Sequence, residues 1–121
     1  MTKAVVVDAS TGEEISSAEA RVDELTPRPG WFERDMDAVW DCCADAIRKA
    51  IAPVGADSIA AVGLCGQNDG CYPVDAALRP VRNAILGTDS RAESYIDRQD
   101  ARALALTGQV PFAASPSVLL K

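Results

Sequence analysis

The sequence predicts an α/β domain, and three observations support this. Two apolar, partly β-branched runs near the start are joined by turn residues, one amphipathic helical pattern follows, and further short apolar runs then alternate with polar loops. The chain has 121 residues, of which 48% are hydrophobic and 25% charged, as is typical of a globular domain with one core. The expected order of elements is ββαβββα, and no internal repeat is evident.

The first two elements are predicted to form a β-hairpin. Residues 4–8 are a β-branched run, residues 9–12 are turn formers, and residues 15–22 supply a returning strand. Residues 23–34 contain two prolines and a glycine in Thr-Pro-Arg-Pro-Gly. We therefore expect a surface connection without regular structure there.

A helix is predicted from residue 36 to about residue 51. Asp35 can cap its first turn, while Arg48 and Lys49 suit the negative end of its dipole ahead of Pro53. Apolar side chains recur at spacings of three and four residues, which predicts that one face is buried. These residues are Met36, Val39, Trp40, Cys43, Ala44, Ile47 and Ile51.

The second half is predicted to contain three strands and a helix. Residues 58–64 are nearly all apolar, as in a strand covered by helices on both faces of a sheet. A polar loop follows, then two strands at residues 71–74 and 81–86 around a turn. Residues 90–106 are expected to be helical, up to Gly108. Both ends of the chain are expected to be cut, because the first strand has no lead-in and residues 117–121 resemble an opening helix.

Composition excludes several classes of function. The net charge of −6 makes nucleic acid an unexpected partner, and no apolar run reaches the length of a membrane span. The chain has no His, and its four cysteines show no C-x-x-C spacing, so no metal site is expected. The cysteines are interpreted as reduced thiols of a cytoplasmic protein.

The polar loop after the strand at 58–64 is the first candidate site. Gln67, Asn68 and Asp69 leave the carboxyl end of that strand, where open α/β sheets bind ligands. Their amides and carboxylate could bracket vicinal hydroxyl groups, since amides donate and accept whereas Asp only accepts. The alternative is that Asn-Asp-Gly is simply a tight turn.

Two further polar stretches are open to more than one interpretation. Asp89, within Thr-Asp-Ser-Arg, could contact a ligand at the end of a strand or cap the next helix, and it stays a candidate. Residues 30–35 place two aromatic side chains and an acid ahead of the long helix. We assign them to structure, as a hydrophobic staple and cap, in preference to a sugar-stacking site.

Taken together, the motifs resemble a known family. Residues 30–40 have the pattern Gly-x-x-Glu-x-Asp-x4-Trp, residues 62–70 contain Gly-Leu-Cys-Gly-Gln-x-x-Gly, and residues 80–86 are Pro-Val-Arg-Asn-Ala-Ile-Leu, followed by Asp89 and Arg91. Their order and spacing resemble the N-terminal half-domain of FGGY carbohydrate kinases, over nearly the whole chain.

The resemblance implies a ribonuclease-H-like, actin-like ATPase fold of three layers, here incomplete. Residues 1–121 would be part of the sugar-binding N-terminal domain, without the first phosphate-loop strand, Asp-x-Gly-Thr, and without the C-terminal ATP domain. The implied reaction transfers the ATP γ-phosphoryl group, with Mg²⁺, to a hydroxyl of a sugar or polyol. The catalytic base, an Asp in the family, would lie beyond Lys121, so this chain alone is expected to be inactive.

The resemblance also implies roles for single residues. Gln67, Asn68 and Asp69 match positions that contact sugar hydroxyls, and Lys3 matches a basic position near the nucleotide phosphates. Phe112 matches a position where glycerol kinases place a substrate-facing Tyr.

Two departures from family patterns bear on the substrate. Xylulokinases have a pattern like Gln-Met-His-Gly where this chain has Gln-Asn-Asp-Gly at residues 67–70. Many family members carry Trp at the position of Gly87. The loop is closer to the Gln-Gly-Asp-Gly of relatives assigned to erythritol.

Two alternatives to a kinase fragment remain open. The chain could be a truncated, non-catalytic module that binds sugar or pairs its open sheet edge with another chain, for example in a homodimer. It could also be a generic acidic α/β domain.

Overall fold

A computed structural model of the chain describes residues 1–67, 69–96 and 105. The chain divides into two interleaved compact units. The first unit comprises Met1–Asp23 and Met36–Cys65, and the second comprises Glu24–Asp35 and Gly66–Lys121. No helix in the described part is both long enough and apolar enough to cross a membrane.

The first unit opens with the predicted hairpin. Strands β1 (Thr2–Val7) and β2 (Glu14–Ala20) pair antiparallel, with Thr2 opposite Ala20. The turn is closed by Asp8, whose Oδ1 accepts hydrogen bonds from the backbone N–H groups of Ser10, at 2.8 Å, and Thr11, at 3.0 Å. The hairpin and its turn are therefore confirmed.

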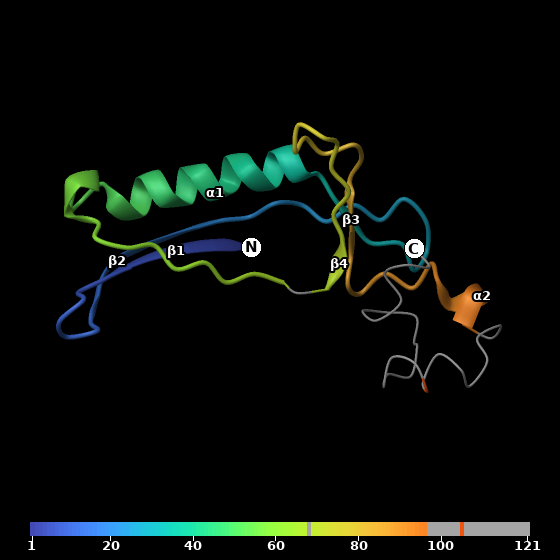
Figure 1. The fold of residues 1–121 in the computed structure, drawn as a ribbon, viewed down its shortest axis with the longest axis horizontal. Helices are drawn as coiled ribbons and strands as arrows, with labels where there is room; N and C mark the ends of the chain where they lie inside the picture. The colour runs from blue at the N-terminus through green and yellow to red at the C-terminus, as the bar shows by residue number, and fades with distance from the viewer. Residues whose placement is uncertain (68, 97–104, 106–121) are drawn as a thin grey trace. The chain divides into compact units, whose positions relative to one another are not determined.

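Helix α1 (Met36–Ile51) covers one face of this hairpin (Figure 1), and its observed bounds match the predicted ones. The contact is made by small side chains, since Ala46 and Ala50 are buried and the Ser16 hydroxyl donates a 2.6 Å hydrogen bond to the Ala50 carbonyl. On this face of the strands the side chains are partly covered, and on the other face they are exposed.

The predicted buried face of α1 is only partly correct. Trp40 is 71% exposed and Ile47 is 48% exposed, although both belong to the predicted apolar face. The spacing predicted the helix correctly, but the face that packs is the one with alanines, because these allow close approach to the small residues of the strands.

The predicted strand at residues 58–64 is wrong for this structure. Ala56–Ser58 form a short 3₁₀ helix, η1, and residues 59–67 belong to no strand. Val62 is 75% exposed and Leu64 is 93% exposed, so the apolar run is not covered within the described residues. A strand needs a neighbour for its backbone hydrogen bonds, and no described strand pairs with this segment.

The second unit is built on a three-stranded antiparallel sheet with the order β3–β5–β4. Its strands are β3 (Glu33–Arg34), β4 (Gly70–Cys71) and the central β5 (Ala84–Leu86), which is buried throughout. Leu25 also bridges to Glu33.

Strand β3 was not predicted, so the expectation that residues 23–34 lack regular structure is wrong at their end. Strand β4 overlaps the start of the predicted strand 71–74, and β5 covers the end of the predicted strand 81–86. An isolated bridge between Val74 and Pro80 extends the pairing between these two segments. The described order is therefore βββαββα, with one strand more before α1 and one fewer after it than predicted.

Helix α2 (Glu93–Ile96) is the described part of the predicted helix at residues 90–106. Apart from Ala105, the remainder of that prediction lies outside the described residues.

Candidate functional site

The candidate sugar-binding loop joins the sheet of the second unit next to the end of β5. Gly70 pairs with Leu86, and the positive φ of Gly70, 138°, turns the chain into β4. The Tyr72 hydroxyl donates a 3.2 Å hydrogen bond to the Asp69 carbonyl. Gln67 and Asp69 are both exposed, and both lie against the buried Gly87 that follows β5. The loop thus presents an amide and a carboxylate at the end of the central strand.

Asp89, two residues beyond Gly87, lies in a different environment. Its side chain is fully buried, and Oδ2 accepts hydrogen bonds from the Phe32 backbone N–H and Arg91 Nη2, both at 2.8 Å. Oδ1 accepts from the backbone N–H and the Nε of Arg91, both at 2.9 Å. These four bonds use the full acceptor capacity of a carboxylate. Burial raises the pKa of Asp89, but the hydrogen bonds from Arg91 and Phe32 outweigh it and leave the pKa below its usual value.

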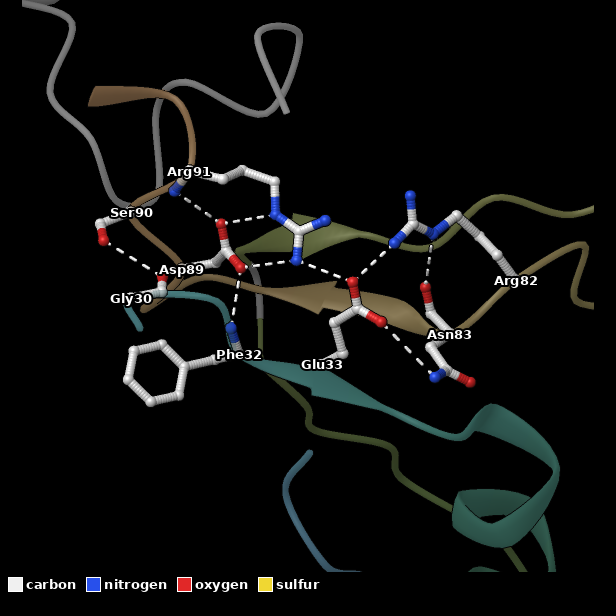
Figure 2. A network of polar contacts seen from close by, with 8 residues as sticks. All are labelled: Gly30, Phe32, Glu33, Arg82, Asn83, Asp89, Ser90 and Arg91. Atoms are coloured by element: carbon white, nitrogen blue, oxygen red, sulfur yellow. Dashed lines mark hydrogen bonds and ion pairs between the residues drawn. The ribbon is translucent and has the colours of Figure 1, made fainter. Parts of the chain in front are cut away.

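Glu33 is the second buried carboxylate of this unit (Figure 2), with 6% of the residue exposed. Its Oε1 lies 2.6 Å from Arg82 Nη2 and 2.8 Å from Arg91 Nη2, and Asn83 Nδ2 is 3.5 Å from Oε2. Burial raises the pKa of Glu33, yet the hydrogen bond from Arg91 and the charge of Arg82 together hold it below its usual value.

Arg91 connects the two carboxylates. Its guanidinium binds both Asp89 and Glu33, and its side chain is only 7% exposed. The guanidinium carbon also lies 4.0 Å from the ring centroid of Trp31, while that of Arg28 lies 4.8 Å from the same ring. A charge-balanced network thus ties residues 31–33 to residues 82–91. It consists of two acids and two arginines, namely Glu33, Asp89, Arg82 and Arg91.

An open hollow of about 470 Å³ lies beside this network. Its lining residues are Pro29, Trp31, Ser90, Arg91, Glu93 and Ser94. The Ser90 hydroxyl and backbone N–H both donate to the Gly30 carbonyl, at 3.1 Å and 2.9 Å. The Ser90 hydroxyl and the Arg91 guanidinium are therefore engaged in internal contacts at this hollow.

The structure brings only part of the predicted site together. Gln67 and Asp69 lie side by side against Gly87, and Asp89 follows in the same segment with its carboxylate saturated. Lys3 is exposed on β1 of the first unit. Asn68 and Phe112 lie outside the described residues.

The sequence patterns do not predict that Glu33, Arg82 and Arg91 form one network. All three residues belong to motifs of the family resemblance, and the prediction for residues 30–35 is a hydrophobic staple and helix cap. Two arginines on one segment, facing an acid on another, were the available signal, but their distance in sequence concealed the pairing.

The described residues contain no group of three His, Cys, Asp or Glu side chains that could hold a metal ion. Lys3 is also the only predicted contact to nucleotide phosphates, and a single exposed lysine does not make a phosphate site.

Comparisons with solved structures indicate the fold. A xylulose kinase from Brucella ovis superposes with a TM-score of 0.81 at 31% identity, covering 92% of this chain and 24% of that one. A xylulose kinase from Rhodospirillum rubrum gives a TM-score of 0.70 at 20% identity, over 84% of this chain and 22% of that one. The fold thus matches part of these sugar kinases, which have the actin-like ATPase fold.

Curated proteins give the same assignment. The L-xylulose/3-keto-L-gulonate kinase of Escherichia coli is 34% identical over 104 residues, which is 80% of this chain and 21% of the relative. A glycerol kinase of Chromobacterium violaceum is 32% identical over 106 residues, 85% of this chain and 21% of the relative. The chain thus spans about a fifth of the length of these relatives. Residues 1–110 match the N-terminal domain of the FGGY family of carbohydrate kinases, and the chain belongs to this family.

Proposed function

We propose that this chain is part of a kinase that transfers the γ-phosphoryl group of ATP to a hydroxyl group of a sugar or polyol. Residues 1–121 would belong to its sugar-binding domain, and the phosphate-loop strand and the ATP domain would lie outside them. Family membership and relatives that are named as xylulose and glycerol kinases support this proposal.

Within this chain we assign substrate binding to Gln67, Asn68 and Asp69. The observation that carries this assignment is the position of Gln67 and Asp69, both exposed and both packed against Gly87 at the end of the central strand. The carboxylate accepts a hydrogen bond from one hydroxyl, while the amide can donate to or accept from its neighbour. Two such groups side by side suit a vicinal diol.

Asp89 receives a positioning role. Its four internal hydrogen bonds leave no acceptor for a sugar hydroxyl, and it fixes the segment that follows Gly87. Phe112 is kept as a proposed apolar substrate contact and Lys3 as a proposed phosphate contact. Mg²⁺, when bound with ATP, would neutralise phosphate charge.

Binding is the direct test for this chain, because the proposed base lies beyond Lys121. The chain is titrated with glycerol, erythritol and L-xylulose by ¹H–¹⁵N NMR. We expect at least one compound to shift the resonances of residues 66–70. Asp69→Asn should weaken that binding about tenfold or more, since a hydrogen bond to a charged group is worth about 1.5–3 kcal/mol.

The matched control is Asp57→Asn, which changes an exposed carboxylate in η1 of the first unit. It should bind as the unsubstituted chain does. The assignment is wrong if no compound moves these resonances, or if Asp69→Asn and Asp57→Asn bind equally well. ADP release with ATP, Mg²⁺ and the bound compound then measures turnover, which we expect to be at background for the chain alone.

A second candidate is an assembly module, favoured by the exposed apolar residues Val62 and Leu64. Such an unpaired segment can add to the sheet of another copy, giving a homodimer. Sedimentation equilibrium tests this. A dimer that Val62→Asp together with Leu64→Asp converts to a monomer would support it, and a monomer at all concentrations would exclude it.

A further inference from the structure

The segment between β4 and β5, residues 72–83, folds back on itself as an arm that ends in a closed turn (Figure 1). At this turn the Asp75 carboxylate accepts hydrogen bonds from the backbone N–H groups of Ala77, at 2.8 Å, and Arg79, at 3.0 Å. The Asp75 N–H donates to the Arg79 carbonyl, and the Leu78 N–H donates to the Asp75 carbonyl, both at 2.9 Å. These four bonds fix the backbone of residues 75–79.

Leu78 lies in this turn in a conformation that is unfavourable for leucine. Its φ is 60°, and no other residue except glycine has a positive φ in the described part of the chain. Glycine adopts this left-handed conformation freely and Asn or Asp adopt it more readily than leucine, whose Cβ is crowded there. Leu78 is also 79% exposed to water. The residue is therefore unfavourable for the free chain in two ways, through its backbone and through its apolar surface.

The rest of the arm is apolar as well. Tyr72 is 40% exposed, Val74 is 51% exposed and Val81 is 60% exposed. Single exposed apolar side chains are normal on a protein surface, but several on one short arm indicate an interaction site. A strained residue that packs on nothing within its own chain is explained when a partner buries it. The arm thus has the features of a binding surface, with Leu78 at its end.

The charges of the turn indicate the kind of partner. Arg79 Nη2 lies 3.1 Å from Asp75 Oδ2, and the arginine side chain is 78% exposed. A partner surface of one sign would meet a repelling charge beside each attracting one. A second copy of the same turn, related by a twofold axis, brings each arginine towards the aspartate of the other copy. The turn is therefore complementary in charge to itself.

We propose that the arm is a self-association surface, through which two copies of the chain meet with their Leu78 side chains at the centre. Arg79 and Asp75 then pair across the contact. One arm from each copy is small compared with the roughly 800 Å² per partner of a stable interface, so the dissociation constant should be about 10 μM to 1 mM. The proposal does not rest on sugar binding, and its surface differs from the exposed segment that contains Val62 and Leu64.

The first experiment is sedimentation equilibrium of the full 121-residue chain at concentrations from about 10 μM to 1 mM. Leu78→Asn replaces the apolar side chain with a polar one of similar size that suits a left-handed backbone. We expect it to weaken dimerisation at least about tenfold. Leu64→Asn is the matched control, because Leu64 is 93% exposed and has no positive φ. It should change dimerisation less than about twofold.

The second experiment measures urea unfolding of the same two variants at a concentration where the chain is monomeric. Leu78→Asn should raise the midpoint of unfolding, because Asn relieves the left-handed strain. Leu64→Asn has no such strain to relieve and should not raise it. A residue kept for stability would give the opposite result for Leu78→Asn, a lower midpoint, and that result would overturn the proposal.

The third experiment tests the charge pairing. Arg79→Glu and Arg48→Glu change the net charge equally, and Arg48 is exposed on α1, outside the arm. Arg79→Glu places two acids on each turn and should weaken dimerisation at least about fivefold, whereas Arg48→Glu should change it less than about twofold. Equal effects of the two variants would overturn the pairing.

The remaining outcomes also decide the proposal. A chain that is monomeric at about 1 mM overturns it. So does a dimer that Leu78→Asn leaves as tight as Leu64→Asn does. A dimer that is lost on Val62→Asp together with Leu64→Asp, but kept in Leu78→Asn, assigns association to the other segment and overturns it as well. Failure of all compounds to bind at residues 66–70 changes none of these measurements.

Discussion

The carboxylate of Glu33 and the guanidinium of Arg91 lie 2.8 Å apart, each side chain only 7% exposed, although 58 residues separate them in sequence. This contact joins β3 to the segment after β5, and the same guanidinium holds Asp89. Removing either partner leaves a charge in the interior of the unit, where unpaired charges are strongly unfavourable.

We therefore expect Arg91→Ala to lower the free energy of unfolding by about 3–5 kcal/mol, because it leaves Glu33 and Asp89 buried without their shared partner. Urea unfolding followed by circular dichroism measures this. Arg79→Ala is the control, since it removes an ion pair with Asp75 whose arginine side chain is 78% exposed. That change should cost about 0–1 kcal/mol. Similar losses for the two variants would contradict the role given to the network.

The same network predicts how stability depends on pH. The pKa values of Glu33 and Asp89 are lower in the folded protein than in the unfolded chain, where carboxyl groups have pKa values of about 4. The stability that these two carboxylates contribute is therefore complete above about pH 5. It is lost as the pH falls through about 4 toward their pKa values in the folded protein. Urea midpoints at about pH 7, 5 and 3 should show a plateau and then a decline.

Glu33→Gln provides the check on that assignment. The variant should be less stable than the unsubstituted chain at about pH 7, yet lose less between about pH 5 and pH 3, because one of the linked carboxylates is gone. Asp8 and Asp75 also have lowered pKa values, through hydrogen bonds that remain in the variant, so some decline persists. An undiminished decline would mean that Glu33 contributes nothing and that Asp89, Asp8 and Asp75 account for the effect.

Gly70 is predicted to tolerate no side chain. Its φ of 138° is unfavourable for other residues, and an added Cβ would lie 2.8 Å from the Ile85 carbonyl oxygen and 2.9 Å from the Tyr72 ring. Gly70→Ala should therefore cost more than the roughly 1–2 kcal/mol of a left-handed backbone alone. Gly55→Ala is the control for a positive φ without close neighbours, because Gly55 has φ 80° and open space around it. Equal losses in urea unfolding would mean that the neighbours of Gly70 yield readily.

Substitutions on the two faces of α1 are predicted to differ in how much they lower the free energy of unfolding. Trp40→Gln should change the free energy of unfolding little, within about 0.5 kcal/mol, since the side chain is 71% exposed. Ala46→Leu should cost about 1–3 kcal/mol, because Ala46 is fully buried against the hairpin. Urea unfolding of both variants measures the difference. If Trp40→Gln is the more damaging change, the face inferred from apolar spacing packs after all.

Local signals allowed some elements to be predicted and others not. The bounds of α1 followed from charges and a proline at its ends, and the hairpin followed from β-branched residues around a turn. Strand β3 escaped prediction because it is two residues long and follows a proline-rich stretch, so no periodicity can reveal it. Residues 58–64 have the composition of a buried strand, but pairing depends on a neighbour that composition does not specify.

The candidate site divides in the same way. Chemistry and motif order were enough to select Gln67 and Asp69, which the structure places together. They did not distinguish these exposed side chains from Asp89, whose carboxylate is saturated by partners up to 57 residues away. Burial and long-range pairing depend on the tertiary structure, and a single sequence carries little information on either.

The interleaving of the two units has a consequence for the order in which the protein forms on the ribosome. All of the first unit has been synthesised once Cys65 is added, so α1 can pack on its hairpin while the rest is still being made. Glu33, synthesised early, has no arginine partner until Arg82 and Arg91 follow. During that interval no arginine of the network is present to balance the Glu33 carboxylate, so the charge is best left in water and β3 is expected to be buried late.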